Sequence, residues 1–163
     1  MKKRNLILVL AVVVVGVAWY AFRPERLFIN QSVSEPFPAA SATTSAASAP
    51  VALVSGQFHS VAHDGKGVAT VFKTPDGKRV LRLTEFETSN GPELMLYLVA
   101  ANDATDSEMV KKAGFVTLGP LKGNEGDQNY EVPAGTDLTK YRAVTVWCHR
   151  FGVNFATAPL AKS

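Results

Sequence analysis

The chain has 163 residues, a formal net charge of +3 and a single cysteine, so it has room for one ordinary domain plus an appendage. The excess positive charge lies in residues 1–50, and twelve basic and twelve acidic groups follow them. Because no basic stripe remains to neutralise phosphates, nucleic acid is excluded as a partner. The lone cysteine, Cys148, excludes an intramolecular disulfide and paired Cys-x-x-Cys zinc or redox sites.

Residues 1–27 are predicted to form an N-terminal membrane anchor. An uncharged apolar run from Leu6 to Phe22 follows basic residues at positions 2–4, an order that removed signal peptides and retained anchors share. The run ends in Trp19 and Tyr20 and lacks the small residues that a signal peptidase needs, which favours retention. We therefore expect a transmembrane helix in contact with the membrane, a cytoplasmic N-terminus, and an extracytoplasmic domain in the periplasm or outside the cell.

Residues 28–52 are predicted to form a flexible linker. They are rich in Ser, Ala, Pro and Thr and contain few large apolar side chains that could anchor them. Some twenty such residues have a typical reach of roughly 25 Å.

From residue 53 to 163 the pattern predicts an all-β fold of about eight strands, either a sandwich or a barrel. Short β-type runs alternate with Gly, Asn, Asp and Pro, which is typical of sandwiches and barrels. The strands are expected near 57–63, 67–73, 79–86, 93–100, 115–119, 128–132, 143–148 and 152–158.

Two local signals punctuate this pattern. Thr74 to Gly77 reads as a hairpin turn in which the glycine supplies a positive φ. One short helix is expected over 105–113, where Thr105 and Glu108 have capping-box spacing.

The side chains that could carry chemistry are few. No nucleophile elbow, zinc helix, Walker loop, dinucleotide fingerprint or haem-attachment motif occurs. A copper site could draw on soft and imidazole donors, but these are not gathered in one C-terminal loop as in blue-copper proteins. The candidate donors are Cys148, His59, His63 and Met95.

Alternation along the strand 143–148 places Val144, Val146 and Cys148 on one face, the natural core face, and Trp147 and His149 on the other. A cysteine there is expected to be at least partly buried. Two readings remain open, a small apolar core residue and a buried ligand to a metal or haem.

The motifs together resemble the electron-transfer DM-thirteen domain, over about Val51 to Leu160. The first half carries Gly56-Gln57-Phe58, His63, Gly67, Phe86, Gly91-Pro92-Glu93-Leu94 and Tyr97-Leu98. The second half carries Leu118-Gly119-Pro120-Leu121-Lys122-Gly123-Asn124, Gly126, Gln128-Asn129-Tyr130, Pro133, Val146-Trp147-Cys148, Phe151, Val153, Phe155 and Ala158.

This resemblance implies that residues 53–163 form a compact antiparallel β-sandwich outside the cytoplasm, of a kind sometimes found beside the DOMON domain. It also implies redox work for the cysteine matched by Cys148, as a bare thiol or as a ligand to a group such as haem. The family's first-motif histidine is matched by His63, whereas Glu93 stands where the family more often has Asp. The Gly91-Pro92 pair also has a purely structural explanation, because it restricts the chain before a strand.

Two functional hypotheses follow. The first is a membrane-tethered redox or electron-transfer module in which Cys148 either is the redox thiol or binds a cofactor together with His63 and His149. Such a module would pass electrons to or from a protein redox partner. The alternative is a non-enzymatic module that binds a protein or glycan, with a structural cysteine and a contact surface from Trp147, His149 and Tyr130. A hydrolase or transferase ranks third, because Asp, Glu and His show no triad spacing.

Overall fold

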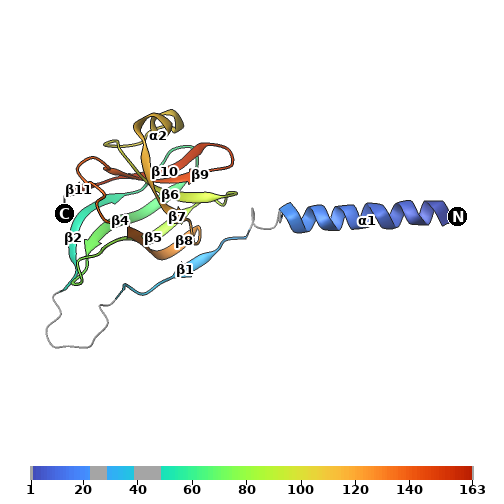
Figure 1. The fold of residues 1–163 in the computed structure, drawn as a ribbon, viewed down its shortest axis with the longest axis horizontal. Helices are drawn as coiled ribbons and strands as arrows, with labels where there is room; N and C mark the ends of the chain where they lie inside the picture. Colours follow the sequence, from blue (N-terminus) through green and yellow to red (C-terminus); the bar gives the residue numbers. More distant parts are fainter. Residues whose placement is uncertain (1, 23–28, 39–48, 163) are drawn as a thin grey trace.

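The computed structural model describes residues 2–22, 29–38 and 49–162. Two β-sheets lie face to face, and one short helix lies on the outer face of the five-stranded sheet (Figure 1). In chain order the elements are α1 (Lys2–Phe22), β1 (Ser32–Ser34), β2 (Val51–Gln57), β3 (His59–Ser60), β4 (Gly65–Lys73), β5 (Arg79–Thr88), β6 (Leu94–Val99), α2 (Ser107–Ala113), β7 (Phe115–Pro120), β8 (Glu125–Val132), β9 (Ala143–Cys148), β10 (Val153–Pro159) and β11 (Ala161–Lys162).

The six-stranded sheet, here sheet A, has the order β1-β8-β5-β4-β2-β11, and the five-stranded sheet B has the order β3-β10-β9-β6-β7. Every strand pair is antiparallel except β1 with β8, which is parallel. The prediction of an all-β antiparallel sandwich is therefore confirmed. The described residues hold three strands that were not predicted, β1, β2 and β11. Strand β1 lies in the predicted linker, β2 begins there, and β11 is too short to leave a period-2 pattern.

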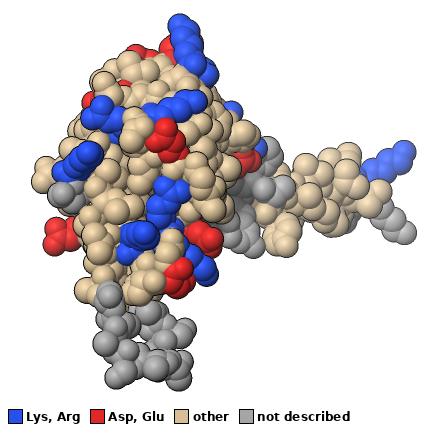
Figure 2. Space-filling view, turned by 60° about the vertical axis from the view of Figure 1, so that its left-hand side comes forward, with Lys and Arg blue, Asp and Glu red and all other residues tan. Residues whose placement is uncertain are grey.

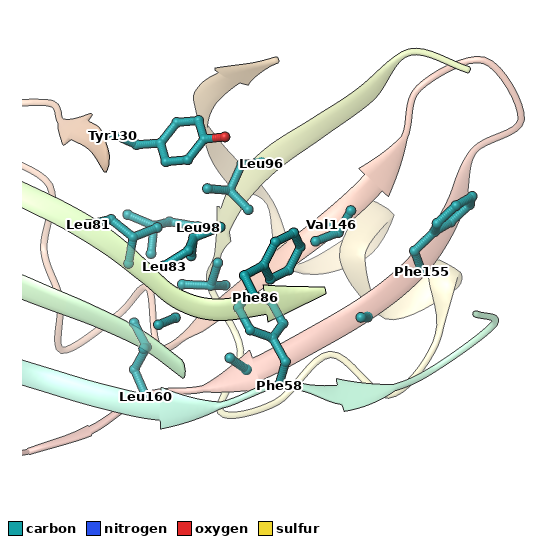
Figure 3. Packing of buried hydrophobic residues seen from close by; sticks show 14 of the residues in the cluster. Phe58, Leu81, Leu83, Phe86, Leu96, Leu98, Tyr130, Val146, Phe155 and Leu160 are labelled. Atoms are coloured by element: carbon teal, nitrogen blue, oxygen red, sulfur yellow. The ribbon is translucent and has the colours of Figure 1, made fainter. Parts of the chain in front are cut away.

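The core fills the space between the two sheets. Leu81 and Leu83 of β5 are fully buried and face Val144 and Val146 of β9 in one cluster. Figure 3 shows aliphatic side chains in the middle of this cluster, with Phe155 at one end. The alternation in β5 and β9 thus identified the core faces correctly.

A second, smaller apolar cluster lies on the outer face of sheet B. Tyr97 and Trp147 contribute to it from the sheet, and Val110 contributes from α2. Because both faces are covered, every residue of β9 is buried. The helix prediction is confirmed in place, but its cap is different: Asp106 accepts a 2.8 Å hydrogen bond from Met109 N, and Glu108 pairs with Lys111 instead of closing a capping box.

The turn at Thr74 to Gly77 is as predicted. Gly77 N donates to Thr74 O at 2.9 Å, and its φ of 84° is one that favours glycine. The chain therefore reverses tightly between β4 and β5.

The N-terminal segment forms the helix α1, but it does not support the prediction of a transmembrane anchor over 1–27. Among the described residues, no helix combines the length and the apolar character needed to cross a membrane. Residues 1 and 23–27 of the predicted anchor lie outside the described residues.

The prediction of a flexible linker over 28–52 is wrong for part of that range. Residues 32–34 pair with β8, and residues 51–52 already belong to β2. Residues 39–48 lie outside the described residues. Composition missed the pairing because it is made largely by backbone groups, which residue types do not encode.

Candidate functional site

Two segments that are far apart in the sequence meet at one end of the core. Strand β6 pairs with β9 so that Leu94 lies opposite Cys148. Just before β6, the thiol Sγ of Cys148 donates a 3.1 Å hydrogen bond to Pro92 O, and His149 N donates to Glu93 O at 3.0 Å. The Gly-Pro-Glu-Leu motif and the Val-Trp-Cys motif are therefore in direct contact.

The thiol is enclosed. Cys148 has no exposed surface and belongs to the apolar cluster between the sheets, flanked by Leu94 on β6 and Val153 on β10. It shares this cluster with Val144 and Val146, as the alternation predicted. Within residues 49–162, the hydrogen-bond partner of the sulfur is the carbonyl oxygen of Pro92.

The loop of residues 90–93, here called the thiol loop, is tightly fitted beside Cys148. A Cβ on Gly91 would lie 2.8 Å from Cζ of Phe155 and 3.0 Å from Cδ2 of Leu94, so only glycine fits. Glu93 adopts a φ of 55°, the left-handed region that a residue with a Cβ enters at a cost. The glycine therefore has a packing role, and the glutamate holds local backbone strain next to the thiol.

The candidate histidines do not join the thiol. His63 is exposed, and its ring stacks on Phe155 with 3.8 Å between centroids. His149 follows Cys148 but is exposed. His59 contacts Asp103, with 3.0 Å between Nε2 and Oδ1.

Within the part of the chain that the structure describes, no group of three or more His, Cys, Asp or Glu side chains could hold a metal ion. Cys148, His63 and His149 are therefore not gathered into one metal-binding group. Met95, the thioether candidate, packs on the outer cluster of sheet B, whereas the thiol belongs to the inner one.

The electrostatics of His59 follow from its neighbours. Partial burial alone would lower the pKa of His59, but the hydrogen bond to Asp103 and its charge outweigh burial and raise the pKa above its usual value. The imidazole of His59 therefore forms an ion pair with Asp103 at the edge of sheet B.

Two residues proposed for a contact surface are not available to one. Trp147 is 6% exposed and Tyr130 is 4% exposed. The hydroxyl of Tyr130 donates to Gln128 Oε1 at 2.7 Å and accepts from Lys122 N at 3.0 Å, and burial raises its pKa. Both aromatic rings are packing residues, because each lies under other elements of the fold.

Sequence reasoning missed the acceptor of the thiol. Pro92 was given only a chain-restricting role, and its partner here is its carbonyl oxygen, which no side-chain pattern encodes. The ring of Phe155, which connects His63 to the thiol loop, was part of the resemblance but was assigned no role. The only sequence signal was that both motifs belong to the same domain.

These features define a class, β-sandwich domains that enclose a single thiol beneath a strained loop. A family model described as Electron transfer DM13 matches residues 57–160, more than half of the chain. The chain therefore belongs to the electron transfer DM13 family. Neither the curated proteins nor the solved structures gave a match.

Proposed function

We propose that this domain is an electron-transfer module in which the thiol of Cys148 is the redox group and the thiol loop controls access to it. The hydrogen bond from Sγ to Pro92 O carries the proposal, because it joins the only thiol to a loop rather than to a rigid strand. Membership of the electron transfer DM13 family supports an electron-transfer role for the domain as a whole.

The chemistry that suits one thiol is a two-electron cycle. The sulfur attacks a hydroperoxide, an S–O bond forms, the O–O bond breaks, and the thiol proton leaves with the alcohol product, which gives a sulfenic acid. A donor thiol then condenses with the sulfenic acid to form a mixed disulfide and water. A second donor thiol releases Cys148 as the thiol and forms the donor disulfide. In sum, two electrons pass from two thiols to one hydroperoxide.

Access to the sulfur requires the thiol loop to open. The strain at Glu93 lowers the cost of leaving the closed conformation, whereas the packing of Gly91 on Phe155 opposes opening. Oxidation also replaces the S–H donor with a larger S–O–H group, which does not fit at 3.1 Å from Pro92 O in this fully buried position, so the sulfenic acid favours an open loop. The fold thus links the oxidation state of Cys148 to the position of this loop.

The role of the thiol is separate from cofactor binding. The imidazoles of His63 and His149 are exposed whereas the sulfur is buried, so these three side chains do not converge as ligands of one metal ion. We therefore place the redox chemistry on sulfur itself.

Native-state alkylation tests the proposal, because Cys148 is the only cysteine and every label reports it. The labelling rate of the full-length protein is measured in increasing urea, below the unfolding transition. Local opening gives a rate that is nearly independent of urea, whereas labelling through global unfolding follows the full equilibrium m-value. We expect the first result, together with a sulfenic acid after peroxide treatment that thiols reduce.

Matched proline variants locate the opening. Pro92→Ala relaxes the thiol loop and should speed labelling about tenfold, that is, by about 1.4 kcal/mol in the opening free energy. Pro75→Ala, in the turn between β4 and β5, should leave the rate unchanged. A thiol that labels only with global unfolding in all three proteins would refute the redox assignment.

The alternative function, a non-enzymatic binding module, is favoured by one observation, the complete burial of Cys148. Because Trp147 is buried, its contact surface would centre on Phe151, which is 69% exposed in the turn between β9 and β10, beside the exposed His149. Pull-down of a specific protein or glycan by the wild type but not by Phe151→Ala would favour this function. Unchanged thiol labelling in that variant separates the two hypotheses.

We also propose that the domain works outside the cytoplasm, in the periplasm or beyond the cell surface. The basic residues before an apolar run support export through the N-terminal segment. Fusion of a reporter enzyme that is active only after export, placed after Ser163, tests this. An inactive reporter on a stable fusion would contradict export.

A further inference from the structure

Residues 30–37, here called the strap, lie along the free edge of β8. Ser32, Val33 and Ser34 pair in parallel with Glu125, Gly126 and Asp127 (Figure 1). The pairing extends on both sides, because Glu125 N donates to Gln31 O at 3.3 Å and Glu35 N donates to Asp127 O at 2.9 Å. The strap precedes the part of the chain that matches the family, residues 57–160, whereas the edge that receives it lies inside that part.

Alternate side chains of the strap face the domain. Val33, Glu35 and Phe37 are partly buried, whereas Ser32, Ser34 and Pro36 are exposed. The ring of Phe37 meets Phe72 of β4 edge-to-face, with 5.0 Å between centroids. Main-chain pairing with side-chain anchors at every second residue is the arrangement of peptides that bind by strand addition.

The receiving edge, here called the acceptor edge and made of residues 122–129, has room for a strand where two glycines lie. A Cβ on Gly123 would stand 2.3 Å from Gln31 O, and a Cβ on Gly126 would stand 2.1 Å from Val33 O. Gly126 also has a φ of 92°, which favours glycine. These two glycines, which belong to the motifs of the family resemblance, therefore leave space for the strap backbone.

Buried polar groups of the acceptor edge depend on the strap. Asn124 is 5% exposed, and its Oδ1 accepts from Gln31 N at 2.7 Å while its Nδ2 donates to Asn30 Oδ1 at 3.1 Å and to Thr88 O. Removing the strap would leave the amide oxygen of Asn124 without this donor, which is costly in a buried position. The edge is thus complete only when an extended segment occupies it.

One carboxylate fixes the register. Glu35 accepts from Lys122 Nζ at 2.8 Å and from Asn129 N at 2.7 Å, and its carbonyl accepts from Arg82 at 3.1 Å. Burial alone would raise the pKa of Glu35, but the hydrogen bonds from Lys122 and Asn129 outweigh it and lower the pKa. A segment without an acid at this position would leave the lysine without its carboxylate partner.

We infer that the acceptor edge is a peptide-binding site for an extended segment with valine, glutamate and phenylalanine at alternate positions, and that the strap is its intramolecular ligand. The site recognises the main chain of the bound segment through β8 and its acidic side chain through Lys122. The strap is therefore a separable element that binds again when it is supplied as an independent peptide.

Cleavage of the full-length chain tests this inference. A protease recognition sequence is inserted between residues 43 and 44, the chain is cut, and the fragments are separated by gel filtration in mild detergent. We expect the N-terminal fragment to co-elute with the domain and a labelled peptide of residues 29–38 to displace it. Dissociation of the fragments without any binding of the peptide would overturn the inference.

A charge swap makes the test specific. In the cleaved wild type, the peptide carrying Glu35→Lys should bind at least tenfold more weakly than the native peptide. In the cleaved Lys122→Glu protein this order should reverse, which a general loss of folding cannot produce. Equal affinity of both peptides for both proteins would refute recognition of the acid and with it the proposed site.

Discussion

The outer faces of the two sheets are covered in different ways. On sheet B, α2 and the aromatic rings of Tyr97 and Trp147 form an apolar cluster. On sheet A the strap follows the edge of β8, and its Phe37 meets Phe72 of β4. The strap is held largely by hydrogen bonds and by the ion pair of Glu35 with Lys122 at 2.8 Å. Basic and acidic side chains also lie interspersed on the face seen in Figure 2. One cover depends on apolar burial, and the other responds to pH and salt.

The largest effect on the free energy of unfolding is expected from a substitution beneath α2. Trp147→Ala should lower the free energy of unfolding by about 3–5 kcal/mol, because it leaves a large cavity in the outer cluster of sheet B. Urea denaturation at low and high salt measures the loss, which should be the same at both. Phe115→Ala, which removes a ring that is 46% exposed and stacked on Tyr97, is the control and should cost clearly less. A strong salt dependence would contradict an apolar cover.

The next effect lies between the sheets. Cys148→Ala should cost about 1–2 kcal/mol through lost packing, with no salt dependence. It also removes the donor to Pro92 O, so hydrogen exchange at His149 N, which donates to Glu93 O, should become faster. An unchanged exchange rate there would mean that the thiol does not hold the loop.

A smaller effect is expected at the strap. Because the pKa of Glu35 is lowered in the fold, its stabilisation is present above its ordinary value of 4.5 and is lost as the pH falls through the folded value. Glu35→Gln should therefore cost under about 1 kcal/mol at pH 7 and nothing in strong acid. Urea denaturation of both proteins from pH 7 down to pH 3 checks this. A difference that persists in acid would exclude the charge as its cause.

The smallest effect concerns His59. Its pKa is raised in the fold, so the stabilisation by Asp103 is present below the unfolded value near 6.5 and is lost as the pH rises through the folded value. The imidazole is 40% exposed, so screening leaves only a few tenths of a kcal/mol. Thermal unfolding of wild type and His59→Gln at pH 5.5 and pH 8.5 should show a difference at the lower pH only. A difference that is larger at pH 8.5 would contradict the ion pair.

Much of the sandwich could be predicted from local patterns. The range Ala143–Cys148 was predicted to the residue, and its valines identified the core face, because a period of two survives wherever a strand is half buried or better. The helix was placed correctly but its cap was not, since Asp106 and Thr105 are equally plausible caps by composition. The prediction of a membrane-spanning helix is not supported, because no helix among the described residues is long and apolar enough to cross a membrane.

The sequence by itself determined the all-β class, the buried face of Cys148 and the family, because these rest on residue type and on spacing along the chain. Only the tertiary structure decided what the thiol contacts and where residues 30–37 go. Both answers depend on backbone atoms, the carbonyl of Pro92 in one case and the pairing edge of β8 in the other. Every residue carries the same peptide groups, so no side-chain pattern encodes which of them will meet.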